Sequence, residues 1–225
     1  MKKRIFEGKP INRALQTRAE IDQCTSLLQQ YEVQEHPISC KNWDLSLIVP
    51  RLVDGNCLDM GCSGGSCILE NALRFGVEGR KIGIDYTLDT APVEGIEKMV
   101  MDLMHTTFED NYFQTLFCLS VLEHQINYHE LARECSRLLK TGGELWITHD
   151  YFDPKPSTEG MKLYSLSWDI LDRKDVERLI EEMKAVGLNI SSPVNYDTTE
   201  AVINPRYCSP APVEYTFMIL HFVKA

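Results

Sequence analysis

The feature that most constrains the fold is a short apolar run that ends in a turn of small residues. Residues 57–60, Cys-Leu-Asp-Met, are too few for a helix and are typical of a buried parallel strand. The turn 61–65, Gly-Cys-Ser-Gly-Gly, follows at once, and residues 66–75 predict a helix that Gly76 ends. Such a turn lets backbone pass close to a ligand beyond the carboxyl end of a strand. The sequence therefore predicts an α/β fold with a ligand site at this turn.

The rest of the chain repeats the alternation of strand and helix. Strands are expected at 81–85, 98–103, 115–121, 144–149, 188–196 and 215–224, and helices at 12–32, 43–52, 128–139 and 173–185. Gly142-Gly143 is expected to end the third of these helices, and Asp172 and Gly187 to cap the last. This order predicts βαβ units and a parallel sheet covered on both faces.

The expected organisation is a single domain over residues 1–225. Residues 1–50 form an N-terminal helical cap, 55–150 the ligand-binding core, and 215–225 the last strand. Residues 151–172 and 197–214, rich in proline and polar residues, are expected to be irregular loops on the substrate side.

Composition excludes several classes of function. The net charge is −10 and no basic run is longer than Lys2-Lys3-Arg4, which disfavours nucleic acid and anionic membranes as partners. The basic N-terminus lacks the apolar region of a secretory signal, and no apolar run is long enough to cross a bilayer. The 8 cysteines lie mostly within apolar runs without zinc-ligand spacing, which predicts free thiols, no metal site and a cytoplasmic location. Nothing in the sequence indicates an oligomeric state.

Acidic residues follow the next two strands. Asp85 ends a strand about 20 residues beyond the glycine turn, where a carboxylate can accept hydrogen bonds from ribose hydroxyls. Asp102-Leu103 ends the following strand and offers a polar group and an apolar surface to a base. Either acid alone could be a cap or turn residue, but in succession they predict an adenosine-sized site across three strand ends.

An ordered series of motifs carries a resemblance to a known family. The motifs are Leu58-Asp59-Met60-Gly61-Cys62-Ser63-Gly64-Gly65, Gly83-Ile84-Asp85, Met101-Asp102-Leu103, Cys118-Leu119-Ser120-Val121-Leu122-Glu123-His124 and Leu138-Leu139-Lys140-Thr141-Gly142-Gly143. In this order they resemble class I S-adenosylmethionine-dependent methyltransferases over residues 55–150. The resemblance implies a Rossmann-like α/β fold, with a seven-stranded, mostly parallel sheet of order 3-2-1-4-5-7-6 and helices on both faces.

The resemblance also implies a cofactor site for S-adenosylmethionine. Gly61 and Gly65 would pass beneath the methionine part, and Asp59 and the Leu119-Ser120 strand end would hold its amino-acid end. Asp85 would bind the ribose, and Asp102 and Leu103 the adenine. The cofactor-binding residues expected in this way are Asp59, Gly61, Cys62, Ser63, Gly65, Asp85, Tyr86, Asp102, Leu103, Leu119 and Ser120.

Two departures from the family pattern bear on this site. Ser63 stands where the family usually has a glycine. A side chain with a hydroxyl group therefore occupies a position at which the family's backbone usually passes close to the cofactor. The family's helix after the ribose-binding acid is not predicted in residues 86–95, which Pro92 interrupts.

Methyl transfer from a sulfonium needs alignment and exclusion of water, and a base if the acceptor is a hydroxyl. His149, His124 and Tyr151 are the candidate catalytic residues, because they follow the fifth and fourth strands of the expected sheet. His124 could instead cap a helix or brace the sheet, and Asp150 could serve only to orient a loop. The aromatic residues Tyr151, Phe152, Tyr164 and Trp168 could form a lid or anchor their loop to the core.

The mixed polar content of the substrate-side segments favours a polar small-molecule acceptor, such as a sugar or glycan precursor. The alternative function is that of a cofactor-binding, non-catalytic partner protein. A nicotinamide-dependent oxidoreductase is a weaker hypothesis, because the turn does not have the G-x-G-x-x-G spacing.

Overall fold

A computed structural model describes residues 11–62, 65–88, 91–204 and 212–225. Its centre is a sheet in the order β1-β10-β6-β5-β2-β3-β4, with β9 also paired to β10. The parallel part consists of β4 (Glu97–Val100), β3 (Lys81–Asp85), β2 (Cys57–Met60), β5 (Phe113–Leu119) and β6 (Leu139–Tyr151). The strand β10 (Thr216–Lys224) runs antiparallel to β6.

From β4 to β10 the strands follow the expected order 3-2-1-4-5-7. Two short strands, β9 and β1, together occupy the place expected for strand 6 beside β10. The short strand β9 (Leu188–Ile190) pairs antiparallel with residues 222–224 of β10. The strand β1 (Arg13–Ala14) pairs with residues 218–219 of the same edge. Within the described residues the sheet therefore has eight strands in place of the seven predicted.

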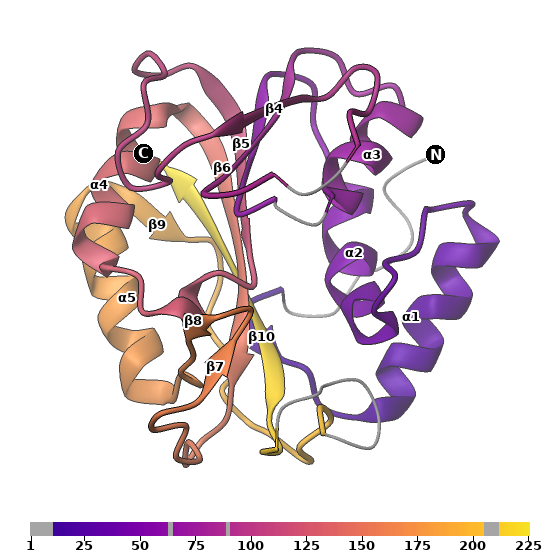
Figure 1. Ribbon diagram of the computed structural model, residues 1–225, viewed down its shortest axis with the longest axis vertical. Coiled ribbons are helices and arrows are strands. Elements are labelled where there is room, and N and C mark those ends of the chain that lie inside the picture. Colours follow the sequence, from indigo (N-terminus) through magenta and orange to yellow (C-terminus); the bar gives the residue numbers. More distant parts are fainter. Residues whose placement is uncertain (1–10, 63–64, 89–90, 205–211) are drawn as a thin grey trace.

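Helices cover both faces of the sheet, as predicted (Figure 1). One face carries α1 (Arg18–Gln30), α2 (Asn42–Ile48) and α3 (Cys67–Arg74), and the other carries α4 (Tyr128–Leu138) and α5 (Arg173–Ala185). The strands contribute alternate side chains to two cores. Leu145 and Ile147 of β6 pack on the α4–α5 side, and Trp146 packs on the α1–α3 side.

The strands expected at 98–103 and 188–196 end earlier, at Val100 and Ile190, and three other expected elements also differ from the structure. The N-terminal helix starts at Arg18 behind its N-cap Thr17 and not at residue 12, because residues 13–14 pair with the open edge of β10. The glycines Gly142-Gly143 do not end α4; the helix ends at Leu138, and both glycines lie inside β6.

The third difference lies in residues 151–172, which were expected to be irregular throughout. They include a two-stranded hairpin of β7 (Lys162–Leu163) and β8 (Leu166–Ser167). Its turn residues Tyr164 and Ser165 both have positive φ, 52° and 66°. Hairpin turns of this kind usually use Asn-Gly or Asp-Gly, so the sequence carries no strong signal for this one.

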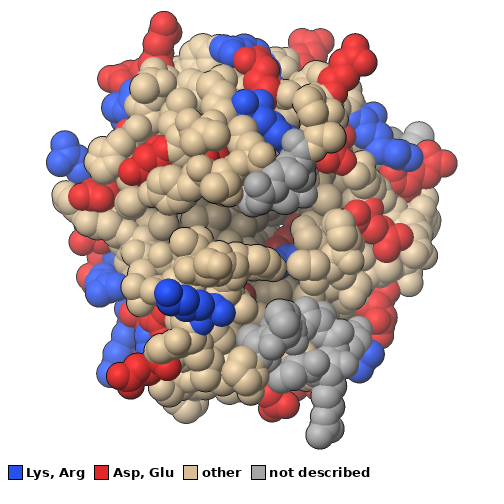
Figure 2. Space-filling model, in the orientation of Figure 1, with Lys and Arg blue, Asp and Glu red and all other residues tan. Residues whose placement is uncertain are grey.

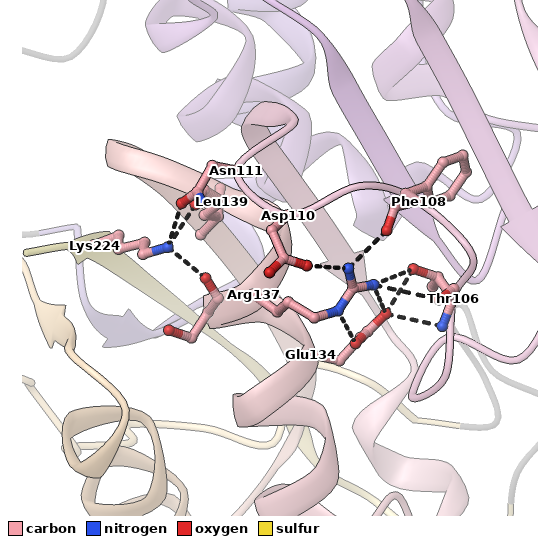
Figure 3. A network of polar contacts seen from close by, with 9 residues as sticks. Thr106, Phe108, Asp110, Asn111, Glu134, Arg137, Leu139 and Lys224 are labelled. Carbon is pink, nitrogen blue, oxygen red and sulfur yellow. Dashed lines mark hydrogen bonds and ion pairs between the residues drawn. The ribbon is translucent and has the colours of Figure 1, made fainter.

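A polar network fixes the loop between β4 and β5 (Figure 3). The Arg137 guanidinium on α4 pairs with Glu134 at 2.8 Å and with Asp110 at 2.7 Å, and donates to the Phe108 carbonyl at 2.6 Å. Glu134 accepts hydrogen bonds from the backbone N–H and the hydroxyl of Thr106, at 2.8 and 2.6 Å. The loop that begins at Asp102 is thereby tied to α4.

Candidate functional site

The glycine turn after β2 has the backbone shape that close approach to a ligand requires. Gly61 and Gly65 have φ values of 96° and 105°, which residues other than glycine rarely adopt. A Cβ at Gly61 would lie 2.4 Å from Cγ2 of Val121. The N–H groups of Gly61 and Cys62 donate to the carbonyl of Ile84 and fasten the turn to β3. Ser63 and Gly64 lie outside the described residues.

Cys62 is a packing residue in this structure. A Cβ at Gly83 would lie 2.6 Å from the Cys62 Sγ, so the glycine in β3 makes room for the thiol. Burial raises the pKa of the Cys62 thiol to about 12. Seven described cysteines, Cys62 among them, are free.

Asp59 is a buried carboxylate next to the turn. Its side chain is hydrogen-bonded to Ser66, whose hydroxyl also caps α3 by accepting from the N–H of Leu69. Burial raises the pKa of Asp59 to about 6, and the bond to Ser66 opposes that shift. A cationic ligand at this carboxylate would relieve the cost of its burial.

The ends of β3 and β4 bring Asp85 and Asp102 to the same edge of the sheet. The N–H of Met101 donates to the Asp85 carbonyl, and both the side chain of Tyr86 and the N–H of Met104 bond to the Asp102 carboxylate. Burial raises the pKa of Asp102, but the bonds from Met104, His105 and Tyr86 outweigh it and lower that pKa. Leu103 is almost fully buried in the core on the α4–α5 side. No helix occurs in the described residues between β3 and β4, as the sequence predicted.

The end of β5 meets the N-terminal cap at Ser120. Ser120 has a φ of 58°, unusual for a residue with a side chain, and its N–H donates to the Thr148 carbonyl at 2.8 Å. Its hydroxyl accepts a hydrogen bond from the Lys41 ammonium. Lys41 comes from the 3-10 turn Ser39–Lys41, directly before α2. Leu119 is half-buried and packs on the same side of the sheet.

A pocket opens beside Ser120, at the carboxyl ends of β5 and β6. It contains about 530 Å³ of empty space that is partly open to solvent. Its lining comes from the N-terminal cap, the strand ends, the β7–β8 hairpin and the start of β10: Ile38, Cys40, Lys41, Ser120, Glu123, His124, Asp150, Leu163, Tyr164, Tyr215 and Phe217. Figure 2 shows this face of the molecule hollowed near its middle, with acidic and basic side chains interspersed around it.

The Lys41 ammonium in the wall of this pocket interacts with three carboxyl groups, two of which, Glu123 and Asp150, also line the pocket. The Lys41 Nζ lies 3.7 Å from the Asp44 Oδ2 and 3.7 Å from the centre of the Phe217 ring. Burial lowers the pKa of Lys41, but the charges of Asp44, Asp150 and Glu123 outweigh it and raise that pKa. Asp44 also accepts a hydrogen bond from the Thr148 hydroxyl at 3.2 Å.

Asp150 and Glu123 are both buried. The Asp150 Oδ2 accepts a hydrogen bond from the Trp168 indole N–H at 2.8 Å, and burial raises the Asp150 pKa to about 6. Burial, followed by the charge of Asp150, raises the pKa of Glu123 well above its usual range. Among the described residues, no group bonds to the Glu123 Oε2.

Of the three predicted catalytic residues, His124 lines the pocket, whereas His149 and Tyr151 do not. His149 and Tyr151 alternate with Thr148 and Asp150 along β6, so they face the α4–α5 side, away from the pocket, and neither is exposed. The His149 Nδ1 lies 3.0 Å from the Asp150 carbonyl, burial lowers its pKa to about 4, and the Tyr151 hydroxyl donates to the Tyr196 carbonyl. This geometry corrects the expectation that His149 and Tyr151 face an acceptor in this pocket.

His124 does line the pocket. Its Nδ1 lies 3.1 Å from the Ser167 carbonyl of β8, so the ring joins the short helix Leu122–His124 to the hairpin. Of the expected lid aromatics, Tyr164 is 79% exposed at the hairpin turn, and Trp168 is buried and anchors the loop through Asp150.

Sequence reasoning missed Lys41, Asp44 and Glu123. Glu123 and Asp150 adjoin residues that were singled out, and the alternation of a strand could have indicated that Asp150, not its neighbours, shares a face with Thr148. Lys41 and Asp44 had no such signal, because only the folding of the N-terminal cap over the sheet brings them to the pocket.

Comparison with known proteins gives the same fold and family. Residues 58–147 match the family described as "Methyltransferase domain". The match covers β2 through most of β6, which includes the glycine turn and the strand ends at Asp85, Asp102 and Ser120. Over residues 58–147 the chain therefore matches a methyltransferase domain, in agreement with the resemblance to class I S-adenosylmethionine-dependent methyltransferases. S-adenosylmethionine, the cofactor predicted from the sequence, is the methyl donor of that family.

Curated relatives match part of the chain. An arsenite methyltransferase from Aquipseudomonas alcaligenes is 26% identical over 145 residues, which are 56% of this chain and 42% of that protein. A ubiquinone biosynthesis O-methyltransferase from Marinobacter nauticus is 32% identical over 108 residues, 44% of this chain and 45% of that protein. The chain thus spans less than half the length of the curated relatives it matches.

Solved structures share the fold. Geranyl diphosphate C-methyltransferase from Streptomyces coelicolor A3(2), in a complex that includes S-adenosyl-L-homocysteine, has a TM-score of 0.58 and 14% identity over 91% of this chain and 84% of its own. A methyltransferase from Haloferax volcanii, in complex with the Trm112 activator, has a TM-score of 0.56 and 13% identity over 92% of this chain and 96% of its own. Among the described residues, no helix combines the length and apolar character needed to cross a membrane.

Proposed function

We propose that this protein transfers the methyl group of S-adenosylmethionine to a polar small molecule bound in the pocket beside Ser120. The observation that carries the proposal is the position of Ser120. It directly follows β5, at the strand end that the family resemblance assigns to the amino-acid part of the donor, and it also lines the pocket. A donor at the strand ends and an acceptor in the pocket would therefore be neighbours, as direct methyl transfer requires.

The residues of the turn fit the donor. Gly61 and Gly65 present backbone without side chains, Asp59 offers a buried carboxylate to an ammonium group, and Asp85 and Asp102 lie at the next strand ends. When bound, S-adenosylmethionine supplies an activated methyl group on a sulfonium. The protein's own part is then to hold the acceptor, exclude water and take up a proton if the acceptor loses one.

The lining of the pocket supports a polar acceptor. Carboxyl groups of Glu123 and Asp150 can accept hydrogen bonds from hydroxyl groups, and Tyr215 and Tyr164 offer ring surface. Carboxylates combined with aromatic rings suit a polyhydroxylated molecule, so a sugar or glycan precursor is the finer form of the proposal. A cytoplasmic location stays a prediction of the sequence.

Calorimetric titration with S-adenosylmethionine, together with detection of released S-adenosylhomocysteine, tests this function. We expect the wild-type chain to bind the donor and Asp85→Ala to weaken binding by about 2–5 kcal/mol, the range for losing one partner of a buried charged hydrogen bond. The control Asp22→Ala changes an exposed acid on α1 and should bind like the wild type. Folded protein without donor affinity would refute the proposal.

Donor binding without turnover is a separate outcome. If no acceptor across a broad panel releases S-adenosylhomocysteine, while the donor binds normally, the non-catalytic partner function becomes the better explanation.

A further inference from the structure

The pocket contains a buried pair of carboxyl groups with unused hydrogen-bonding capacity. Glu123 lies in the short helix Leu122–His124 that follows β5, and Asp150 lies near the end of the neighbouring strand β6. They are 4% and 3% exposed, and both line the pocket. Asp150 is fixed by the Trp168 indole, and the Glu123 backbone carbonyl accepts a hydrogen bond from the Asp169 N–H at 2.8 Å. Both residues are thus anchored to the segment around β8. The Glu123 Oε2 has no hydrogen-bond partner in the part of the chain that the structure describes.

Burying a carboxyl oxygen without a hydrogen-bond partner costs folding free energy unless a ligand donates a hydrogen bond to it. Leaving such a group without a hydrogen bond costs about 1–3 kcal/mol. This oxygen belongs to a residue of the pocket wall, so a hydrogen-bond donor on a ligand in the pocket could satisfy it. We propose that Glu123 and Asp150 together bind a neutral hydroxyl group of the acceptor and remove its proton as it is methylated. This inference rests on the proposed function and deepens it to O-methylation.

The surroundings favour a hydroxyl over an amine that arrives as a cation. The ring face of Phe217, which could attract a cation, is already covered by the Lys41 ammonium at 3.7 Å. Lys41 would repel a second ammonium in the same pocket, and it already offsets the negative charge of the ionised carboxyl groups there. A neutral hydroxyl avoids this repulsion and still donates the hydrogen bond that Glu123 can accept.

The pair can hold the proton that such a step releases. Burial raises the pKa of both groups, and the charge of Asp150 raises that of Glu123 further. Near neutral pH the raised pKa keeps Glu123 protonated, whereas Asp150, with a pKa of about 6, is mostly ionised, so the two groups together carry one negative charge. As the acceptor oxygen forms its bond to the methyl carbon, its O–H bond breaks and the ionised carboxylate takes the proton. The sulfur keeps the electrons of the broken S–CH₃ bond and becomes a neutral thioether.

Paired probes of one shape test the acceptor class. Benzyl alcohol and cyclohexanol serve as hydroxyl probes, and benzylamine and cyclohexylamine, which are cations at neutral pH, as the amine probes of matching shape, with S-adenosylhomocysteine release as the readout. We expect product from at least one hydroxyl probe and from neither amine. Product from an amine alone, or donor binding without product from either hydroxyl probe, would overturn the inference and leave donor binding intact. Absence of donor binding would instead refute the proposed function.

Variants of the pair give a readout that does not depend on turnover. We expect the infrared spectrum of the wild type at neutral pH to contain a protonated carboxyl band. Difference spectra of the wild type minus Glu123→Gln and of the wild type minus Asp150→Asn should each show a change in that band. The control Glu181→Gln, an exposed acid on α5, should leave the band and the activity unchanged. Asp150→Asn should lower turnover about 100-fold or more, because it removes the carboxylate that takes up the proton, with donor affinity within about twofold of wild type.

Three results would contradict the role of the pair. They are a wild-type spectrum without a protonated carboxyl band, a band that neither substitution alters, and undiminished turnover in both variants. Asp150→Asn provides the second variant should Glu123→Gln fail to fold.

Discussion

Replacing Lys41 with methionine tests the electrostatic reasoning about the pocket. Methionine keeps much of the length of the side chain and its contact with Phe217, but removes the only described ammonium facing Asp44, Asp150 and Glu123. The variant therefore leaves buried carboxyl groups without their cation. Removing one partner of a buried ion pair typically costs about 3–5 kcal/mol of folding free energy.

The size of the effect should depend on pH, and the sign follows from Asp150. Its pKa is raised to about 6, against roughly 4 in an unfolded chain, so its burial costs about 3 kcal/mol when it is ionised. That cost is absent below about pH 4 and fully present once the pH has risen above about 6. Lys41 can offset only the charge of ionised carboxyls, so its removal should matter most in the higher range.

Urea unfolding of the wild type and Lys41→Met at pH 5 and pH 8 measures this difference. We expect a loss of about 3–5 kcal/mol at pH 8 and below about 2 kcal/mol at pH 5, where Asp150 is largely protonated. Lys174→Met changes an exposed lysine on α5 and should have little effect at either pH. Equal losses at the two pH values, or a loss no larger than that of Lys174→Met, would refute the reasoning.

Two further predictions concern the cofactor turn and the network of Figure 3. Gly61→Ala should reduce donor affinity at least tenfold by calorimetry, because a positive φ costs a residue with a Cβ about 1–2 kcal/mol and the new methyl group would overlap Val121. Normal affinity in this variant would show that the turn tolerates a side chain. Glu134→Gln should cost about 2 kcal/mol in urea unfolding at pH 7, where hydrogen bonds from Arg137 and Thr106 outweigh burial and hold the pKa of Glu134 below its usual value. A group with a lowered pKa stabilises the fold above its unfolded pKa and loses that contribution as the pH falls through its folded pKa. The difference in unfolding free energy between the wild type and Glu134→Gln should therefore shrink toward pH 3. A difference that stays constant with pH would contradict this prediction.

Where the sequence pattern is local and strong, prediction and structure agree closely. The bounds of β2, β3 and α5 were predicted to the residue, because short apolar runs next to glycines and a helix with an Asp172 cap leave few alternatives. The sheet order and the family followed from motifs that stand at successive strand ends. These features are properties of neighbours in the chain, and a single sequence records them directly.

The pocket depends on contacts between distant parts of the chain. Lys41 reaches Ser120, 79 positions away, and Trp168 reaches Asp150 across the β7–β8 hairpin. A sequence marks His149 as a plausible base, yet the pleat of β6 turns it to the opposite face and presents Asp150 in its place. The amino-acid sequence by itself predicted the methyl donor and the strand ends that are expected to receive it. Only the tertiary structure decided which carboxyl groups line the pocket beside Ser120, because that depends on how the cap and the hairpin fold over the sheet.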